Sequence, residues 1–216
     1  MGNPRYSMKP ALDGLDDKLS KYLNFRNGFF IEAGGNDGIS QSNTYYLERG
    51  LGWNGVLIEA IPELFEKCRI NRRRASVFNG ALVSKAYEKS TLRMHYAGLM
   101  SIGNGAMPQQ ELKLHVEAGI QNLEESYEID VPAVTFEQIL NSLDIKRIDF
   151  LSLDVEGAEL ESLKGFNFVK HRPLYILIES RNLDETEIYL ASKNYKLIDH
   201  LSPLDYLFKD YSNKTF

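Results

Sequence analysis

The sequence predicts an α/β domain, built on a mostly parallel sheet with helices on both faces. Segments with the apolar composition of buried strands alternate along most of the chain with segments of helical periodicity. The segments 55–59 and 148–154 are almost continuously hydrophobic, without alternation between apolar and polar residues. Such strands are typical of parallel sheets that are buried on both sides.

The chain is long enough for one domain. It has 216 residues, of which 43% are hydrophobic, so an ordinary buried core is expected. Apolar residues recur at helical spacing from Leu12 to Leu23. We therefore expect an N-terminal helical extension over residues 1–24 and one domain over residues 25–216.

The expected elements follow one another in a regular order. Strands are expected at 28–33, 55–59, 76–83, 92–96, 148–154 and 174–179, and helices at 41–49, from Pro62, at 135–143, 158–163 and 184–193. Thr135 and Gln138 have the spacing of a capping box. Segments 195–201 and 205–209 are expected to close the domain as an antiparallel pair.

Residues 97–125 interrupt this order. The stretch 98–110 is rich in Gly, Met, Asn and Pro and has no periodicity, and 112–125 is compatible with a helix or an excursion. A long irregular segment inside a compact domain is more often functional than idle. We expect a lid or insertion here.

Charge and composition exclude several classes of function. The net charge of −5 gives no positive field for a nucleic-acid partner, and no apolar run is long enough to span a membrane. The run KCRINRRR at 67–74 is interpreted as a solvated helix end, with an anionic-substrate site as the alternative. Cys68, the only cysteine, is interpreted as a packing residue. A soluble, cytoplasmic protein is expected.

Four expected strands end in a carboxylate: Glu32, Glu59, Asp154 and Glu179. The carboxyl ends of parallel strands line the ligand crevice of such sheets. Four acids at one edge are costly to hold together without a cationic ligand or a metal ion. This pattern is the strongest indication of function in the sequence.

The segment FIEAGGNDG at 30–38 places glycines between a strand and the next helix. Glycines permit a tight turn and a close approach of a ligand to the backbone. The spacing differs from the G-x-G-x-x-G of dinucleotide-binding proteins, and the acids around it suit a cationic group such as an ammonium or sulfonium. Glu59 follows Gly38 by about twenty residues, where an acid binds the hydroxyls of an adenosine ribose.

Four segments resemble one family in sequence and in order. FIEAGGNDG, LIEAIPELFEKCRINRR, IDFLSLDVEGAELESLKGF and NYKLIDHLSPLDYLF are similar to the FkbM family of methyltransferases, over roughly residues 25–209. The resemblance implies a Rossmann-like class I methyltransferase fold with a seven-stranded sheet and S-adenosylmethionine as cofactor. It also implies O-methylation of a hydroxyl on a sugar, nucleotide-sugar, polysaccharide or natural-product acceptor.

The same resemblance assigns Glu32, Gly34, Asn36, Asp37 and Gly38 to the methionine-binding loop and Glu59 to the ribose. From their places along the chain we add Ala60 beside Glu59, Asn79 and Gly80 towards the adenine, and Ser101 and Asp154 as cofactor-binding candidates. The family loop more often begins with Asp and reads GANDG, whereas this chain has Glu32 and Gly35. Both departures are mild.

Methyl transfer to a hydroxyl requires a base or a metal ion that lowers the pKa of the hydroxyl. Asp154, Glu156 and His95 are the candidate bases. Alternatively, Asp154 and Glu179 hold a Mg²⁺ ion through hard oxygen ligands.

Two rival classes are an NAD-dependent oxidoreductase, which the absent G-x-G-x-x-G disfavours, and a non-catalytic binding protein. The acceptor's identity and a homo-oligomeric state are left open.

Overall fold

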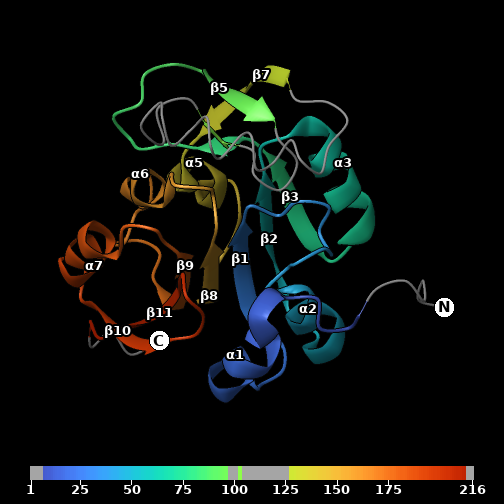
Figure 1. Cartoon of the computed structure of the whole chain (residues 1–216), viewed down its shortest axis with the longest axis vertical. Coiled ribbons are helices and arrows are strands. Elements are labelled where there is room, and N and C mark those ends of the chain that lie inside the picture. Colours follow the sequence, from blue (N-terminus) through green and yellow to red (C-terminus); the bar gives the residue numbers. More distant parts are fainter. Residues whose placement is uncertain (1–6, 97–101, 104–126, 213–216) are drawn as a thin grey trace.

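A seven-stranded sheet forms the centre of the computed structural model, which describes residues 7–96, 102–103 and 127–212 (Figure 1). In spatial order its strands are β10 (Tyr195–His200), β11 (Asp205–Asp210), β9 (Pro173–Glu179), β8 (Ile148–Leu153), β1 (Phe29–Ala33), β2 (Asn54–Glu59) and β3 (Ala75–Asn79). The pairs from β9 to β3 are parallel, and β11 is antiparallel to both of its neighbours. The predicted mostly parallel sheet and its antiparallel closing pair are confirmed.

Helices cover both faces of this sheet because successive strand residues point to opposite sides. One face packs against α5 (Phe136–Asn141), α6 (Glu159–Lys164) and α7 (Leu183–Ala191). The other packs against α1 (Leu15–Leu23), α2 (Tyr45–Leu51) and α3 (Pro62–Asn71). The neighbouring residues Ile31 and Phe30 of β1 show how the faces alternate. Ile31 packs in the apolar cluster on the first face, and Phe30 packs in the cluster on the second face. The capping box of Thr135 and Gln138 is present at the start of α5.

The expected N-terminal helix is part of the core. A 3-10 turn, η1 (Leu12–Gly14), leads into α1, whose Leu15, Leu19 and Leu23 are buried against the sheet. The hydroxyl of Tyr22 donates a hydrogen bond to Asp199 of β10, 2.7 Å away. The part of the chain before β1 therefore contributes to one wall of the domain.

A second, smaller sheet is the main feature that the sequence analysis did not predict. Its order is β4 (Ala81–Leu82), β7 (Tyr127–Val134), β5 (Thr91–Tyr96) and β6 (Ile102–Gly103). The strand expected at 76–83 is wrong as a single element, because the chain leaves the large sheet at Gly80 and continues in the small one. A Cβ at Gly80 would lie 2.6 Å from Val134, so this crossing requires glycine.

The small sheet lies beyond the carboxyl ends of the large sheet's central strands, above them in Figure 1. A third apolar cluster joins the small sheet to the start of α3 and consists of Ile61, Leu64, Ala81, Met94 and Val131. The lid expected at 97–125 lies outside the described residues, apart from β6.

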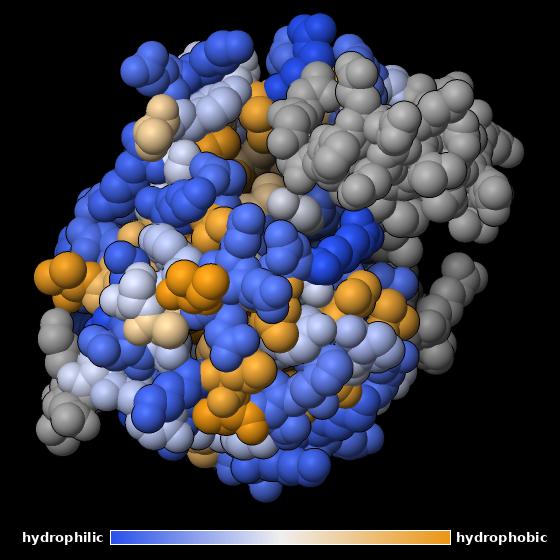
Figure 2. Space-filling model, turned by 60° about the vertical axis from the view of Figure 1, so that its left-hand side comes forward, coloured by the Kyte–Doolittle hydropathy of each residue, from blue (hydrophilic) through white to orange (hydrophobic). Residues whose placement is uncertain are grey.

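The surface is mainly polar. Figure 2 shows hydrophobic residues in small groups among hydrophilic ones, with further hydrophobic side chains inside a hollow near the top of that view. Among the helices that the structure describes, none has the length and apolar composition needed to cross a membrane.

Candidate functional site

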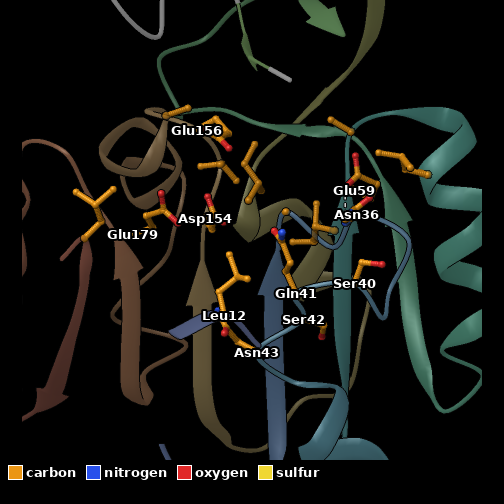
Figure 3. A pocket seen from close by; sticks show the side chains of 18 of the residues that line it. Leu12, Asn36, Ser40, Gln41, Ser42, Asn43, Glu59, Asp154, Glu156 and Glu179 are labelled. Atoms are coloured by element: carbon orange, nitrogen blue, oxygen red, sulfur yellow. Dashed lines mark hydrogen bonds between the residues drawn. The ribbon is translucent and has the colours of Figure 1, made fainter. Parts of the chain in front are cut away.

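A cavity of about 590 Å³ lies at the carboxyl ends of the central strands. In Figure 3, Asn36 and Glu59 occupy one side of it, Asp154, Glu156 and Glu179 the other, and Leu12 and Gln41 lie between them. Apolar residues also contribute to the lining, chiefly Ile61, Leu64, Ala81, Leu92 and Met94. The cavity thus combines carboxylates at both ends with an apolar wall from the small sheet and the start of α3.

The loop after β1 passes close to the end of β8. Gly34 has a φ of 85°, and a Cβ there would lie 1.9 Å from the carbonyl oxygen of Asp154, so only glycine fits. The amide groups of Gly34 and Gly35 donate hydrogen bonds to the carbonyl of Ile58 in β2. The glycines therefore hold the loop between β2 and β8, at the floor of the cavity.

Glu59, the last residue of β2, is held by backbone amides. Its Oε2 accepts a hydrogen bond from the Asn36 amide at 2.7 Å, and its Oε1 accepts one from the Ile61 amide at 2.8 Å. Burial raises the pKa of Glu59 to about 7, and these amide bonds oppose the rise. A carboxylate has about four lone-pair sites, so Glu59 retains the capacity to accept from two ligand hydroxyls.

Asp154 and Glu179 form a carboxyl pair at the opposite end. Asp154 follows β8, Glu179 ends β9, and both side chains line this end of the cavity. Burial raises the pKa of both groups, and the Glu179 charge raises the pKa of Asp154 further. Each negative charge makes the other more costly, so both carboxyl groups at this end of the cavity bind a proton more readily than a solvated carboxylate does.

Glu156 and Arg181 lie beside this pair. Their side chains form an ion pair at 3.2 Å, while burial raises the pKa of Glu156 to about 7. Glu159 accepts hydrogen bonds from the amides of Val155 and Gly157 and so fixes the turn between β8 and α6. Glu156, at φ 53°, is held in a left-handed conformation within this turn.

Glu32 points away from the cavity, into a buried polar network. It accepts hydrogen bonds from the hydroxyls of Ser42 and Thr44, and Arg72 lies 3.3 Å from it. Arg72 is fully buried and also pairs with Glu48 at 2.8 Å. The interpretation of the whole run 67–74 as a solvated helix end is therefore wrong at Arg72, because the loop before α2 folds back over it.

This network shapes the loop that borders the cavity. Arg72 donates hydrogen bonds to the Gly38 carbonyl and to the hydroxyls of Ser42 and Thr44. Asp37 caps the same loop by accepting from the amides of Ile39 and Ser40. Both groups thus support the loop from behind its cavity-facing side.

Other predicted residues have different surroundings. Asn79 donates hydrogen bonds from its amide to the carbonyls of Glu59 and Ala60, and Gly80 and Ala60 line the cavity. His95 of β5 lies 3.3 Å from Glu128 of β7 and does not line the cavity. Ser101 lies outside the described residues. Cys68 is buried, as expected of a packing residue.

Several cavity residues were not among the sequence-based candidates. Leu12 and Asp13 come from η1, Asn43 from the loop before α2, and Asp205 from the start of β11. The Oδ1 atom of Asn43 is buried and has no hydrogen-bond partner among the described residues. Within the described ranges, no three His, Cys, Asp or Glu side chains gather as a metal site.

The arrangement is that of a Rossmann-like class I methyltransferase fold. The sequence model described as the methyltransferase FkbM domain matches residues 32–210. The chain belongs to the FkbM methyltransferase family.

Solved structures of methyltransferases resemble the chain at low sequence identity. A TehB-like SAM-dependent methyltransferase from Corynebacterium glutamicum is 10% identical, with 97% of this chain and 90% of that chain covered and a TM-score of 0.47. An O-methyltransferase from Bacillus cereus in complex with SAH is 13% identical, with 91% of this chain and 78% of that chain covered and a TM-score of 0.45. Precorrin-6y C5,15-methyltransferase from Geobacter metallireducens is 11% identical, with 94% of this chain and 90% of that chain covered and a TM-score of 0.47. Comparison with curated proteins gave no match.

Proposed function

We propose that the protein is an S-adenosylmethionine-dependent methyltransferase that methylates a hydroxyl oxygen of a sugar or similar polyhydroxylated acceptor. Family membership supports the methyl transfer. The observation that carries the proposal is the Asp154–Glu179 carboxyl pair at one end of a cavity whose other end holds Glu59. One end suits the hydroxyls of a ribose, and the other suits the removal of a proton.

The lining residues fit such a cofactor. Glu59 would accept hydrogen bonds from two ribose hydroxyls, while Ile61, Leu64 and Met94 would offer an apolar surface to a flat adenine ring. The unpartnered Oδ1 of Asn43 offers an acceptor for an ammonium group. When bound, S-adenosylmethionine supplies a methyl group activated on a sulfonium sulfur.

The chain's own part in the reaction is positioning and proton transfer. The carboxylate of Asp154, beside Glu179, accepts the proton of the acceptor hydroxyl as the oxygen attacks. Glu156 and its partner Arg181 border the same end and orient the acceptor through hydrogen bonds. The apolar wall excludes water, which would compete with the acceptor.

The metal-dependent alternative uses the same two carboxylates. Asp154 and Glu179 lie at the same end of the cavity, and the described residues place no third acidic or histidine ligand in metal geometry with them. The proposed mechanism therefore has no step that depends on a metal ion. Activity that EDTA abolishes and Mg²⁺ restores would favour the alternative.

Transfer of a labelled methyl group tests the proposal. The protein is incubated with methyl-labelled S-adenosylmethionine and a panel of sugars and polyols, and the products are analysed for O-methyl groups. We expect labelled O-methyl product, and turnover reduced about 10²-fold or more in Asp154→Asn because proton transfer is impaired. Asn141→Asp, on the exposed end of α5, serves as a matched control. Methylation of nitrogen only, or full activity in Asp154→Asn, would contradict the proposal.

A further inference from the structure

The N-terminal turn, residues 11–15, forms one wall of the cavity although it precedes the segment matched by the family model. Leu12, Asp13 and Leu15 all line the cavity. Leu15 is buried in the core, whereas Leu12 is 53% exposed, and in Figure 3 its side chain points into the cavity. The turn therefore presents an accessible apolar side chain to any bound ligand.

The turn is fixed to the loops on either side of the cavity. Ala11 forms a parallel β-bridge with Gln41 of the loop after β1, and its amide donates a hydrogen bond to Asp16 at 2.9 Å. On the other side, Lys18 of α1 donates a hydrogen bond to the carbonyl of Leu201, before β11. These contacts hold the turn, and with it Leu12, at the border of the cavity.

The backbone of the turn is shaped to expose Leu12. Asp13 and Gly14 have φ values of 51° and 67°, two consecutive left-handed residues. This conformation is costly for a residue with a side chain, although Asp tolerates it better than most. It allows Leu12 to face the cavity before the chain turns into α1 at Leu15.

We infer that the N-terminal turn covers the amino-acid end of the bound cofactor, with Leu12 packed against its aliphatic chain. Leu12 lies beside Gln41 and Asn43 in Figure 3, and Asn43 carries the unpartnered oxygen suited to an ammonium group. The opposite side, at Glu59, suits the ribose. The inference rests on the proposed function, because it assumes the same cofactor.

Cysteine accessibility tests the inference without an acceptor. Cys68 is buried, so Leu12→Cys introduces one readily accessible thiol. Met8→Cys is the matched control, because Met8 is 50% exposed and does not line the cavity. The rate of alkylation by N-ethylmaleimide is measured without ligand, with S-adenosylhomocysteine and with adenosine, which lacks the amino-acid chain. Calorimetry first establishes saturation for each variant.

Saturating S-adenosylhomocysteine is expected to slow alkylation at position 12 by about tenfold or more, since few protein molecules remain free. It should leave position 8 unchanged, and adenosine should protect neither position. If S-adenosylhomocysteine bound without protecting position 12, or if adenosine protected it equally, the inference about the N-terminal turn would be overturned and the proposed function would not. Absence of binding to the unmodified protein would overturn the proposed function as well. Amide hydrogen exchange of residues 8–16 in the unmodified protein gives an independent readout and should slow only with S-adenosylhomocysteine.

Discussion

Glu59 is a buried carboxyl group whose two oxygens already accept backbone hydrogen bonds. Burial raises its pKa to about 7, so without ligand it is partly protonated at neutral pH. Hydroxyl groups of a ribose donate to its ionised form and stabilise that form. Binding of the proposed cofactor is therefore coupled to loss of a proton from Glu59.

This coupling predicts a pH-dependent affinity for S-adenosylhomocysteine. Above about pH 7 Glu59 is ionised before binding and the affinity is constant, whereas below pH 7 the affinity falls by up to about tenfold per pH unit. Calorimetry across this range in wild type and Glu59→Gln measures it. The variant should bind weakly and lose this pH dependence. An identical profile in both proteins would contradict the role of Glu59.

At the scale of elements, Arg72 joins the end of α3 to the loop before α2. It contacts Glu48 of α2 directly and supports the residues around Ser42 that border the cavity. Because Arg72 is completely buried, its charge is stable only with these partners in place. The network thus links the packing of two helices to the shape of the proposed cofactor site.

Replacing Arg72 should therefore affect both stability and binding. Arg72→Met leaves Glu48 and Glu32 buried without a cationic partner, and we expect a loss of about 3–5 kcal/mol in the free energy of unfolding. Urea denaturation measures this loss, and S-adenosylhomocysteine affinity should fall in the folded fraction. Arg73→Met, at the exposed neighbouring position, is the control and should change neither quantity appreciably. Equal stability of the two variants would contradict the account of the network.

The sequence predicted the large sheet well because its strands are short, continuously apolar and bounded by glycines or carboxylates. It did not predict β7, whose sequence YEIDVPAV alternates polar and apolar residues and contains Pro132. The carboxylates that line the site could be located because each ends a strand. The buried state of Arg72 could not, since it depends on how a loop more than twenty residues away folds back, which leaves no local signal.

At the scale of the whole molecule, folding buries several carboxyl groups of the site and so makes their ionisation less favourable. Burial raises the pKa of Glu59 and Glu156 to about 7 and that of Asp154 and Glu179 as well. In the unfolded chain these groups ionise near pH 4. Between these limits the folded state binds more protons than the unfolded state, so its stability decreases as pH rises.

This difference in proton binding predicts that the ligand-free protein becomes less stable as pH rises from about 5 to about 7, and that the loss levels off above the folded pKa of about 7. His171 offsets part of this loss within the same interval, because burial lowers its pKa below the ordinary value of 6.5, and the raised carboxyl groups outnumber it. Thermal unfolding across this interval should show a falling Tm, with a smaller slope in Asp154→Asn. A Tm that rises with pH in the wild type would contradict the assignment of these raised pKa values.

The most direct test of the central claim, that the cavity binds S-adenosylmethionine, is a calorimetric titration at pH 8 with S-adenosylhomocysteine and, separately, with NAD. We predict saturable binding of S-adenosylhomocysteine, no binding of NAD, and at least about a tenfold loss of affinity in Glu59→Gln because charge-assisted hydrogen bonds to the ribose are removed. Binding of NAD in preference, or unchanged S-adenosylhomocysteine affinity in folded Glu59→Gln, would contradict the account.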